Sequence, residues 1–293
     1  MTARWQTLVL TVLSLVVTVL VWHAFRTQPY ATPRGLVMVF ERVRRSNTLR
    51  VGYLVEPPYL NKQTRSGRLS GIYYDFTNEI GARLGLRVEW VEEVNLATLS
   101  EGLESGRYDL VAFPLWRNAI RSKSVYFSHP LLYTPVGAYV RSSDHRFDKS
   151  LGAINDPTIR VASMDGELAG EIAKESFPRA HLVSLPQMSD YNQLLLEVQS
   201  NKADVTFFTK VLGDRYIRAN PDSLKEITGD QPIRVYGETL ILPLGDERFK
   251  SMIDATVDEL IDNGALSKIF ADNGERYESY YRPALPYRQP VTQ

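Results

Sequence analysis

The sequence predicts an α/β protein built from two units of similar size and preceded by a membrane-spanning segment. Strand-like and helix-like segments alternate from residue 49 to residue 113. The same alternation starts again near residue 159 and continues to residue 272. Residues 5–25 carry no formal charge at neutral pH and match the thickness of a bilayer's hydrocarbon layer.

The composition excludes several classes of protein. The 293 residues include 34 basic and 34 acidic side chains, and 44% are hydrophobic, as in folded globular proteins. A neutral balance disfavours general nucleic-acid binding, which needs a basic surface. The absence of cysteine excludes disulfides, zinc–thiolate sites and thiol nucleophiles. The four histidines form no close pair, so we expect neither a metal site nor a cofactor.

Residues 5–25 have the features of a retained membrane anchor. At about 1.5 Å per residue they span roughly 30 Å as a helix. Trp5 and Trp22 lie near its ends, where aromatic rings prefer the membrane interface. A cleaved signal peptide is the alternative, but neither Ala24 nor Ala31 completes a small-x-small cleavage site.

Residues 26–47 form a basic juxtamembrane linker. Five arginines against one glutamate give residues 26–46 a net charge of +4. The positive-inside rule alone would therefore place the following domain in the cytoplasm. Residues 36–45 either form a short amphipathic helix near the bilayer or are a plain linker.

The first α/β unit follows the linker. Asp75 and Asn95 are candidate N-caps, and Gly85 and Gly106 mark the ends of the helices that follow them. The series β-α-β-α-β implies a mostly parallel sheet with crossover helices. Its strands are predicted at 49–54, 86–91 and 109–113, and its helices at 75–84 and 96–104.

The second unit repeats this alternation. Gly264 separates its last two helices, and the segment 276–293 is rich in Pro and Tyr. Its strands are predicted at 159–164, 181–185, 203–208 and 235–242, and its helices at 166–177, 191–200, 246–262 and 265–272.

Six short motifs occur in the order found in one known family. They are Leu49-Arg50-Val51-Gly52 with Pro57-Pro58-Tyr59, Gly67-x-Leu69-x-Gly71-Ile72-x-x-Asp75-Phe76, Leu84-Gly85-Leu86, Gly106-x-x-Asp109, Arg121-x5-Phe127-Ser128-x-Pro130, and Asp258-x-Leu260-x3-Gly264-x-Leu266-x-x-Ile269. On these motifs, residues 49–272 resemble bacterial extracellular solute-binding proteins of the polar amino acid type, the receptors of uptake transporters.

The resemblance implies a hinged, two-lobe periplasmic-binding-protein type 2 fold. Lobe one would comprise residues 48–132 and 238–275, and lobe two residues 133–237. The hinge segments would lie near Leu132–Thr134 and Gly237–Thr239. The ligand would bind between the lobes, which close over it, beyond the carboxyl ends of the strands.

The resemblance assigns Arg121 to the ligand carboxylate, which a guanidinium binds with two parallel hydrogen bonds. The remaining positions depart from the family pattern. Trp116 replaces a Ser or Thr, and Asn118 replaces a Thr. Glu167 stands in a Gly-Glu-Leu sequence where the family has Gly-Ser-Thr. Thr209 replaces the acidic residue that pairs with the ligand's ammonium group, so an ordinary free amino acid is not expected to bind.

Other residues could compensate for these losses. Glu56, Asp165 and Glu167 follow predicted strands, where carboxylates could hold a cationic ligand. Asp165 and Glu167 could equally serve the start of a helix. Tyr59 and Trp116 could stack on a flat or cationic ligand, or could belong to the core.

The sequence therefore predicts a single-pass inner-membrane protein whose folded domain lies in the periplasm. We expect it to capture a small anionic or zwitterionic solute and to deliver it to the permease of an ABC transporter. The alternative is a sensor or scaffold subunit of a membrane complex, with a degenerate binding cleft.

No enzyme activity is expected. The sequence contains no Gly-x-Ser-x-Gly elbow and no phosphate-binding loop. Relatives that are dehydratases have a carboxylate at the position of Thr209. Membrane-bound lytic transglycosylases carry a similar module before a catalytic domain, which is not expected here because few residues follow the module.

Overall fold

The computed structural model describes residues 38–274 and residue 280. The chain divides into two units, residues 1–38 and residues 39–293, and the fold below is that of the second. The predicted anchor, residues 5–25, lies outside the described residues. Among the residues that are described, no helix is long and apolar enough to cross a membrane.

A mixed sheet organises the described residues, and its eight main strands follow the order β4-β1-β5-β12-β7-β10-β8-β9. The first three, β4 (Arg87–Glu93), β1 (Thr48–Tyr53) and β5 (Leu110–Trp116), are parallel. Helices α3 (Ile72–Leu84) and α4 (Leu99–Glu104) connect them. The predicted β-α-β-α-β series is therefore confirmed. A two-stranded ribbon, β2 (Asn61–Lys62) with β3 (Leu69–Ser70), lies outside this sheet.

Helix α3 begins before the predicted start. Gly71, with φ of 115°, is its N-cap, so the prediction that Asp75 caps this helix is wrong. Asp75 lies in the first turn, and its carboxylate accepts a 2.7 Å hydrogen bond from the side-chain amide of Asn273. The earlier start brings Ile72 and Tyr73, both fully buried, onto the helix face that contacts the core.

The second half repeats the pattern with a parallel set of strands. These are β8 (Arg160–Met164), β9 (His181–Leu185) and β10 (Val205–Thr209). Helices α5 (Leu168–Ser176) and α6 (Gln193–Gln199) confirm two predicted helices. Helix α7 (Lys210–Ala219) was not predicted.

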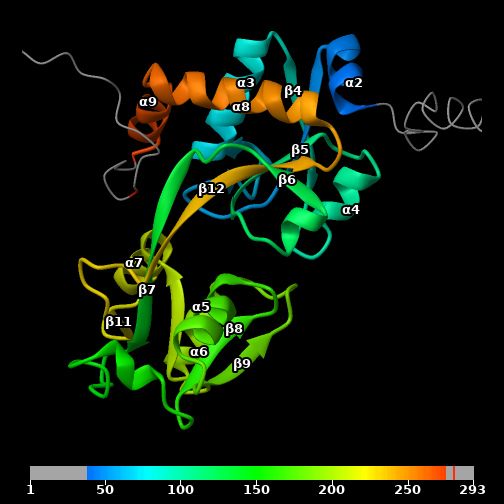
Figure 1. The fold of residues 1–293 in the computed structure, drawn as a ribbon. Helices are drawn as coiled ribbons and strands as arrows, with labels where there is room; N and C mark the ends of the chain where they lie inside the picture. Colours follow the sequence, from blue (N-terminus) through cyan, green and yellow to red (C-terminus); the bar gives the residue numbers. More distant parts are fainter. Residues whose placement is uncertain (1–37, 275–279, 281–293) are drawn as a thin grey trace, which may run out of the picture. The chain divides into compact units, whose positions relative to one another are not determined.

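Two long strands join the halves of the sheet. β7 (Leu132–Arg141) and β12 (Arg234–Pro243) run side by side and antiparallel (Figure 1). Gly237 pairs with Tyr133 between them. β12 also pairs with β5, and β7 with β10. The predicted hinge segments lie in these strands, at the point where β7 and β12 pair with each other. The short strands β6 (Val125–Phe127) and β11 (Leu224–Glu226) pair with β12 and β7.

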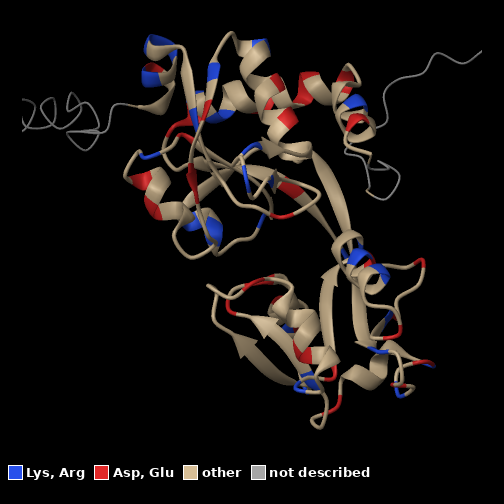
Figure 2. Cartoon of the chain, turned by 180° about the vertical axis from the view of Figure 1, so that it is seen from behind, with Lys and Arg blue, Asp and Glu red and all other residues tan. Residues whose placement is uncertain are grey.

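Helices at the ends of the described chain pack on the first half. α8 (Glu247–Asp262) and α9 (Ala265–Asp272) contact α3, and Gly264 between them has φ of 82°. Within the predicted linker, α2 (Val39–Ser46) is a helix, and Arg42 pairs with the buried Asp109. Basic and acidic positions are intermixed along the helices, as expected for a neutral chain (Figure 2).

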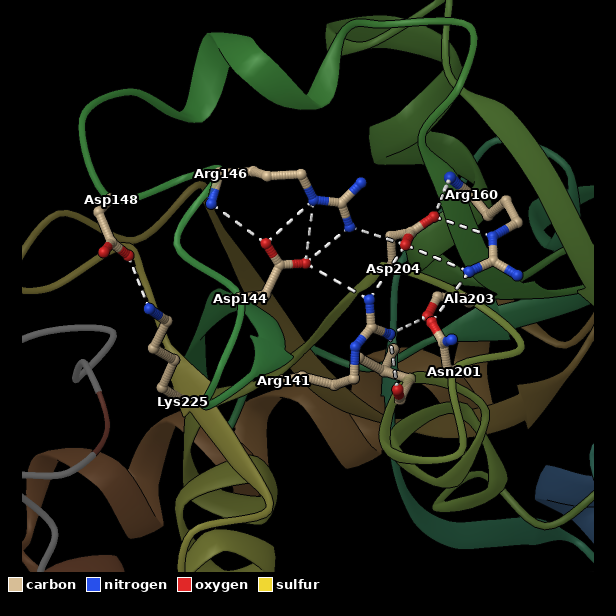
Figure 3. Close-up of polar contacts among 10 residues, drawn as sticks. Arg141, Asp144, Arg146, Asp148, Arg160, Asn201, Ala203, Asp204 and Lys225 are labelled. Atoms are coloured by element: carbon tan, nitrogen blue, oxygen red, sulfur yellow. Dashed lines mark hydrogen bonds and ion pairs between the residues drawn. The ribbon is translucent and has the colours of Figure 1, made fainter.

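An ion-pair network holds the loop after β7 against β8 and β10. Asp204 accepts hydrogen bonds from Arg141, Arg146 and Arg160 at 2.8–3.2 Å, and Asp144 pairs with two of these arginines (Figure 3). Burial alone would raise the pKa of Asp204, but the bonds from Arg160 and Arg146 outweigh it and hold that pKa below its usual range. The network therefore stabilises the charged form of Asp204. It also holds the loop after β7 at the amino ends of β8 and β10.

Candidate functional site

A cavity of about 210 Å³ lies at the carboxyl ends of the parallel strands. Its walls come from the segments that follow β1, β4, β8, β9 and β10, from the end of β5 and from one residue of β12. Both halves of the sheet thus contribute to one cavity. Open α/β sheets bind ligands at this edge, so the cavity is the candidate binding site.

An ion pair between Arg121 and Glu167 lies beside this cavity. Arg121 follows β5, and Glu167 precedes α5, so the pair joins the two halves. The side chains are only 13% and 3% exposed. The residue predicted to bind a ligand carboxylate is therefore paired with a carboxylate of the chain itself, while its Nη1 is buried without a hydrogen-bond partner among the described residues.

Local structure fixes the position of Arg121. It opens a short 3-10 helix, and the Asn118 side chain accepts a 2.7 Å hydrogen bond from the Arg121 backbone N–H. The guanidinium carbon lies 5.7 Å from the centre of the Trp116 ring, within cation–π range. Asn118 thus positions the arginine without lining the cavity, and Trp116 does both.

Glu167 is the N-cap residue of α5 and follows Gly166, whose φ of 73° suits only glycine well. Burial raises the pKa of Glu167 above its usual value, and Arg121 offsets part of that rise. The Glu167 side chain does not cap the helix through a hydrogen bond. Its main polar interaction is therefore the ion pair with Arg121. It does not cap the helix, which was one of the two roles that the sequence left open.

Glu238 is a cavity residue that the sequence analysis missed. It lies in β12, is 4% exposed, and accepts a hydrogen bond from the hydroxyl of Thr134 in β7. Its Oε2 is buried without a partner among the described residues. Burial raises its pKa to about 7, against the bond from Thr134, which lowers it. A charged residue inside an apolar strand was the signal available in the sequence.

Glu56 lies on the cavity wall in the loop after β1. Its backbone exchanges two 3.0 Å hydrogen bonds with that of Leu60, which close the loop. Burial and the neighbouring Asp190 raise the pKa of Glu56 to about 7, although Asn192 and Arg215 oppose this rise. Two carboxyl groups of the cavity, Glu56 and Glu238, therefore change charge near neutral pH.

Aromatic residues and Thr209 complete the cavity. Tyr59 is buried at 2% exposure and packs edge to face against Tyr73 and Tyr280. Tyr191, also missed by the sequence analysis, stacks on Phe208 with ring centres 4.4 Å apart. The hydroxyl of Thr209 is buried without a partner among the described residues.

The predicted site residues thus fall into three groups. Glu56, Tyr59, Trp116, Glu167 and Thr209 line the cavity. Arg121 and Asn118 lie beside it, joined to it through Glu167 and Trp116. Asp165 is exposed outside the cavity, and its carboxylate accepts a hydrogen bond from Ser184. In the described part of the chain, no cluster of His, Asp and Glu is arranged to hold a metal ion.

A two-part sheet with a cavity between its halves is the architecture of the two-lobe periplasmic-binding-protein fold. Residues 49–274 match the bacterial extracellular solute-binding proteins, family 3, and the chain belongs to this family. The resemblance found in the sequence is therefore confirmed.

Individual relatives include binding proteins and enzymes. A probable amino-acid ABC transporter-binding protein of Haemophilus influenzae is 22% identical, over 79% of this chain and 86% of that protein. Membrane-bound lytic murein transglycosylase F of Salmonella paratyphi B is 24% identical over 65% of this chain, but the match spans only 37% of that enzyme.

A solved structure is similar in fold. An ancestral amino acid-binding protein, a precursor of cyclohexadienyl dehydratase, has a TM-score of 0.67 and 21% identity, covering 80% of this chain and 99% of its own.

The Arg121–Glu167 pair should be strongly coupled in stability. Arg121→Met leaves Glu167 buried without its partner, so we expect a loss of about 3–5 kcal/mol in the free energy of unfolding. Adding Glu167→Gln removes the stranded charge and should restore most of this loss. Urea unfolding at pH 7 measures both variants, with Lys123→Met on the same short helix as an exposed control. Equal losses in the single and double variants would contradict the coupling.

Glu238 should make folding less stable as pH rises. Its pKa is about 7 in the folded state against a usual 4.5, so the folded chain keeps a proton that the unfolded chain releases between these values. Stability is therefore lost as pH rises through this window. Glu238→Gln should raise stability by about 3 kcal/mol above pH 7 and by much less below pH 5.

Urea unfolding of this variant at about pH 5 and pH 8 tests the expectation. The exposed Glu104→Gln is the matched control. A gain for Glu238→Gln that is the same at both pH values would contradict a raised pKa at Glu238.

Proposed function

We propose that this protein is a receptor that binds a small solute in the cavity and presents it to the permease of an ABC transporter. The observation that carries the proposal is a set of buried polar atoms in the cavity lining and directly beside it. Arg121 Nη1, Thr209 Oγ1 and Glu238 Oε2 have no hydrogen-bond partner among the described residues. Buried polar groups are costly when left unpaired, so a bound solute that pairs with them would gain free energy.

Of the two kinds of solute predicted, a zwitterion suits the cavity better than an anion. Four of its lining residues are acidic, namely Glu56, Glu167, Asp190 and Glu238. An anion would be repelled by these carboxylates, whereas an ammonium group would be attracted. Arg121 lies beside the cavity and is already paired with Glu167, so it contributes little to holding a carboxylate of the solute.

Membership of an extracellular family supports a periplasmic location for the folded domain, against the charge of residues 26–46. We propose that residues 5–25 anchor it to the inner membrane. We also propose that it converts no substrate, because the family is one of solute-binding proteins.

The Arg121–Glu167 pair favours a second candidate function. Arg121 is already neutralised by Glu167 of the same chain. On this alternative, the cleft no longer binds a solute. The protein would then be a sensor or scaffold subunit of a membrane complex.

A thermal-shift screen of the full chain separates the two functions. The panel holds amino acids, amines, polyamines, dicarboxylates and tricarboxylates. A solute at a hundred times its dissociation constant adds about 2.7 kcal/mol of stability, which should raise the melting temperature by roughly 5–10 °C. The rise should disappear in Thr209→Val with Glu238→Gln, which removes two of the unpaired groups. A flat response across the panel would contradict the receptor and favour the scaffold.

Anchoring by residues 5–25 has a separate test. The full chain should stay with the membrane during alkaline carbonate extraction, and its intact mass should include residue 1. Val12→Arg with Val16→Arg should release it, because each charge costs about 2.5–3.5 kcal/mol at the centre of a membrane helix. A mass that lacks the first 24 or 31 residues would instead show a cleaved signal peptide.

A further inference from the structure

The cavity is strongly acidic for its size. Its lining includes four carboxylates, and none of its lining residues in the described part of the chain is Lys, Arg or His. The adjacent Arg121 neutralises Glu167. Glu56, Asp190 and Glu238 also line the cavity, and the charge of Arg215 offsets part of the rise in the pKa of Glu56.

Tyr191 lines the cavity together with three glutamates, Glu56, Glu167 and Glu238. Burial raises the pKa of the Tyr191 hydroxyl well above its usual value, and the fields of Glu167, Glu238 and Glu56 raise it further. Tyr191 therefore lies within the electrostatic reach of all three carboxylates. The cavity lining also has two buried oxygens that can accept a hydrogen bond and have no partner among the described residues. They are Oε2 of Glu238 and the hydroxyl Oγ1 of Thr209, which can donate as well. Two unpaired acceptors near several carboxylates form a site for a hydrogen-bond donor with positive charge.

Much of the remaining wall is apolar, beside the polar Asn95, Gln187 and Ser189, and suits a compact hydrocarbon group. Leu54, Val94, Phe113, Leu115, Leu168 and Leu212 contribute to it. A dry apolar cavity of about 150 Å³ in another protein takes up benzene. The present volume of about 210 Å³ therefore has room for one ring with a short chain.

We propose that the cavity selects small primary amines with an apolar body, and that Glu238 is the residue that binds their ammonium group. The sequence had indicated that the usual counter-charge was missing because Thr209 occupies its place. In the structure Glu238, on β12, supplies a carboxylate at the same cavity. A carboxylate on the solute is not required, because Glu167 already pairs with Arg121. This inference rests on the proposed function and specifies its solute.

Three phenyl compounds test which charge is recognised. Phenethylamine carries only the ammonium group, 3-phenylpropionate only the carboxylate, and phenylalanine both. Isopentylamine serves as a second amine with a smaller body. Isothermal titration calorimetry with the full chain in detergent at pH 8 measures their affinities. We expect at least one amine to bind, phenylalanine to bind no more tightly than phenethylamine, and 3-phenylpropionate to bind at least tenfold more weakly than either.

Glu238→Gln keeps the shape of the side chain and removes its charge. It should weaken binding of the amine at least tenfold, since a hydrogen bond to a charged group is worth about that factor or more. Glu56→Gln should weaken binding too, and Glu104→Gln, exposed and away from the cavity, should leave it unchanged.

The outcomes separate this inference from the proposed function. If neither amine binds, or if 3-phenylpropionate binds as well as phenethylamine, the inference is wrong. Unchanged amine binding in Glu238→Gln also overturns it. In each case, a stabilising solute in the wider thermal-shift panel would leave the receptor function standing.

Discussion

The antiparallel pairing of β7 with β12 is the constraint on which the rest of the structure depends. Each half of the sheet contains its own parallel strands and crossover helices, and these two strands are the hydrogen-bonded link between the halves. Parallel strands present their carboxyl ends at one edge. Because β7 and β12 join the halves, both of these edges contribute walls to the same cavity. Glu238 belongs to β12 itself, so a solute that binds it contacts the link directly.

Burial of charge connects stability with binding at this site. The chain buries Glu167 and Glu238 and partly buries Glu56, although desolvation raises the pKa of each. Glu167 is compensated by its ion pair with Arg121, whereas Glu238 receives one hydrogen bond, from Thr134, and a smaller contribution from the charge of Arg121. A buried carboxylate that is poorly compensated destabilises the free protein, and a ligand that supplies the missing charge recovers that free energy. The cost in the unbound state and the affinity for a cation therefore have the same origin.

Much of the fold could be predicted from the sequence because its signals are local. Alternating apolar strands and glycines at helix ends located most elements, and the family motifs supplied the topology. Helix α7 was missed because Gly213 weakens its helical pattern. The structure gives the reason for this glycine: a Cβ there would lie 2.2 Å from the ring of Tyr139. A tertiary contact thus selected a residue that local propensity disfavours.

The site could be predicted only in part, because its decisive interactions are long-range. Family motifs identified Arg121, but its partner Glu167 is 46 residues away in the sequence. Asp165 and Glu167 have the same chemistry two residues apart, yet one is exposed and the other buried. Between them the chain turns at Gly166, whose φ is 73°. Glu238 was overlooked because the sequence of a strand does not show which other strand it will pair with. It therefore does not show which side chains will surround this glutamate. The net charge around the cavity is thus a property of the assembled lining, and no single residue such as Arg121 determines it.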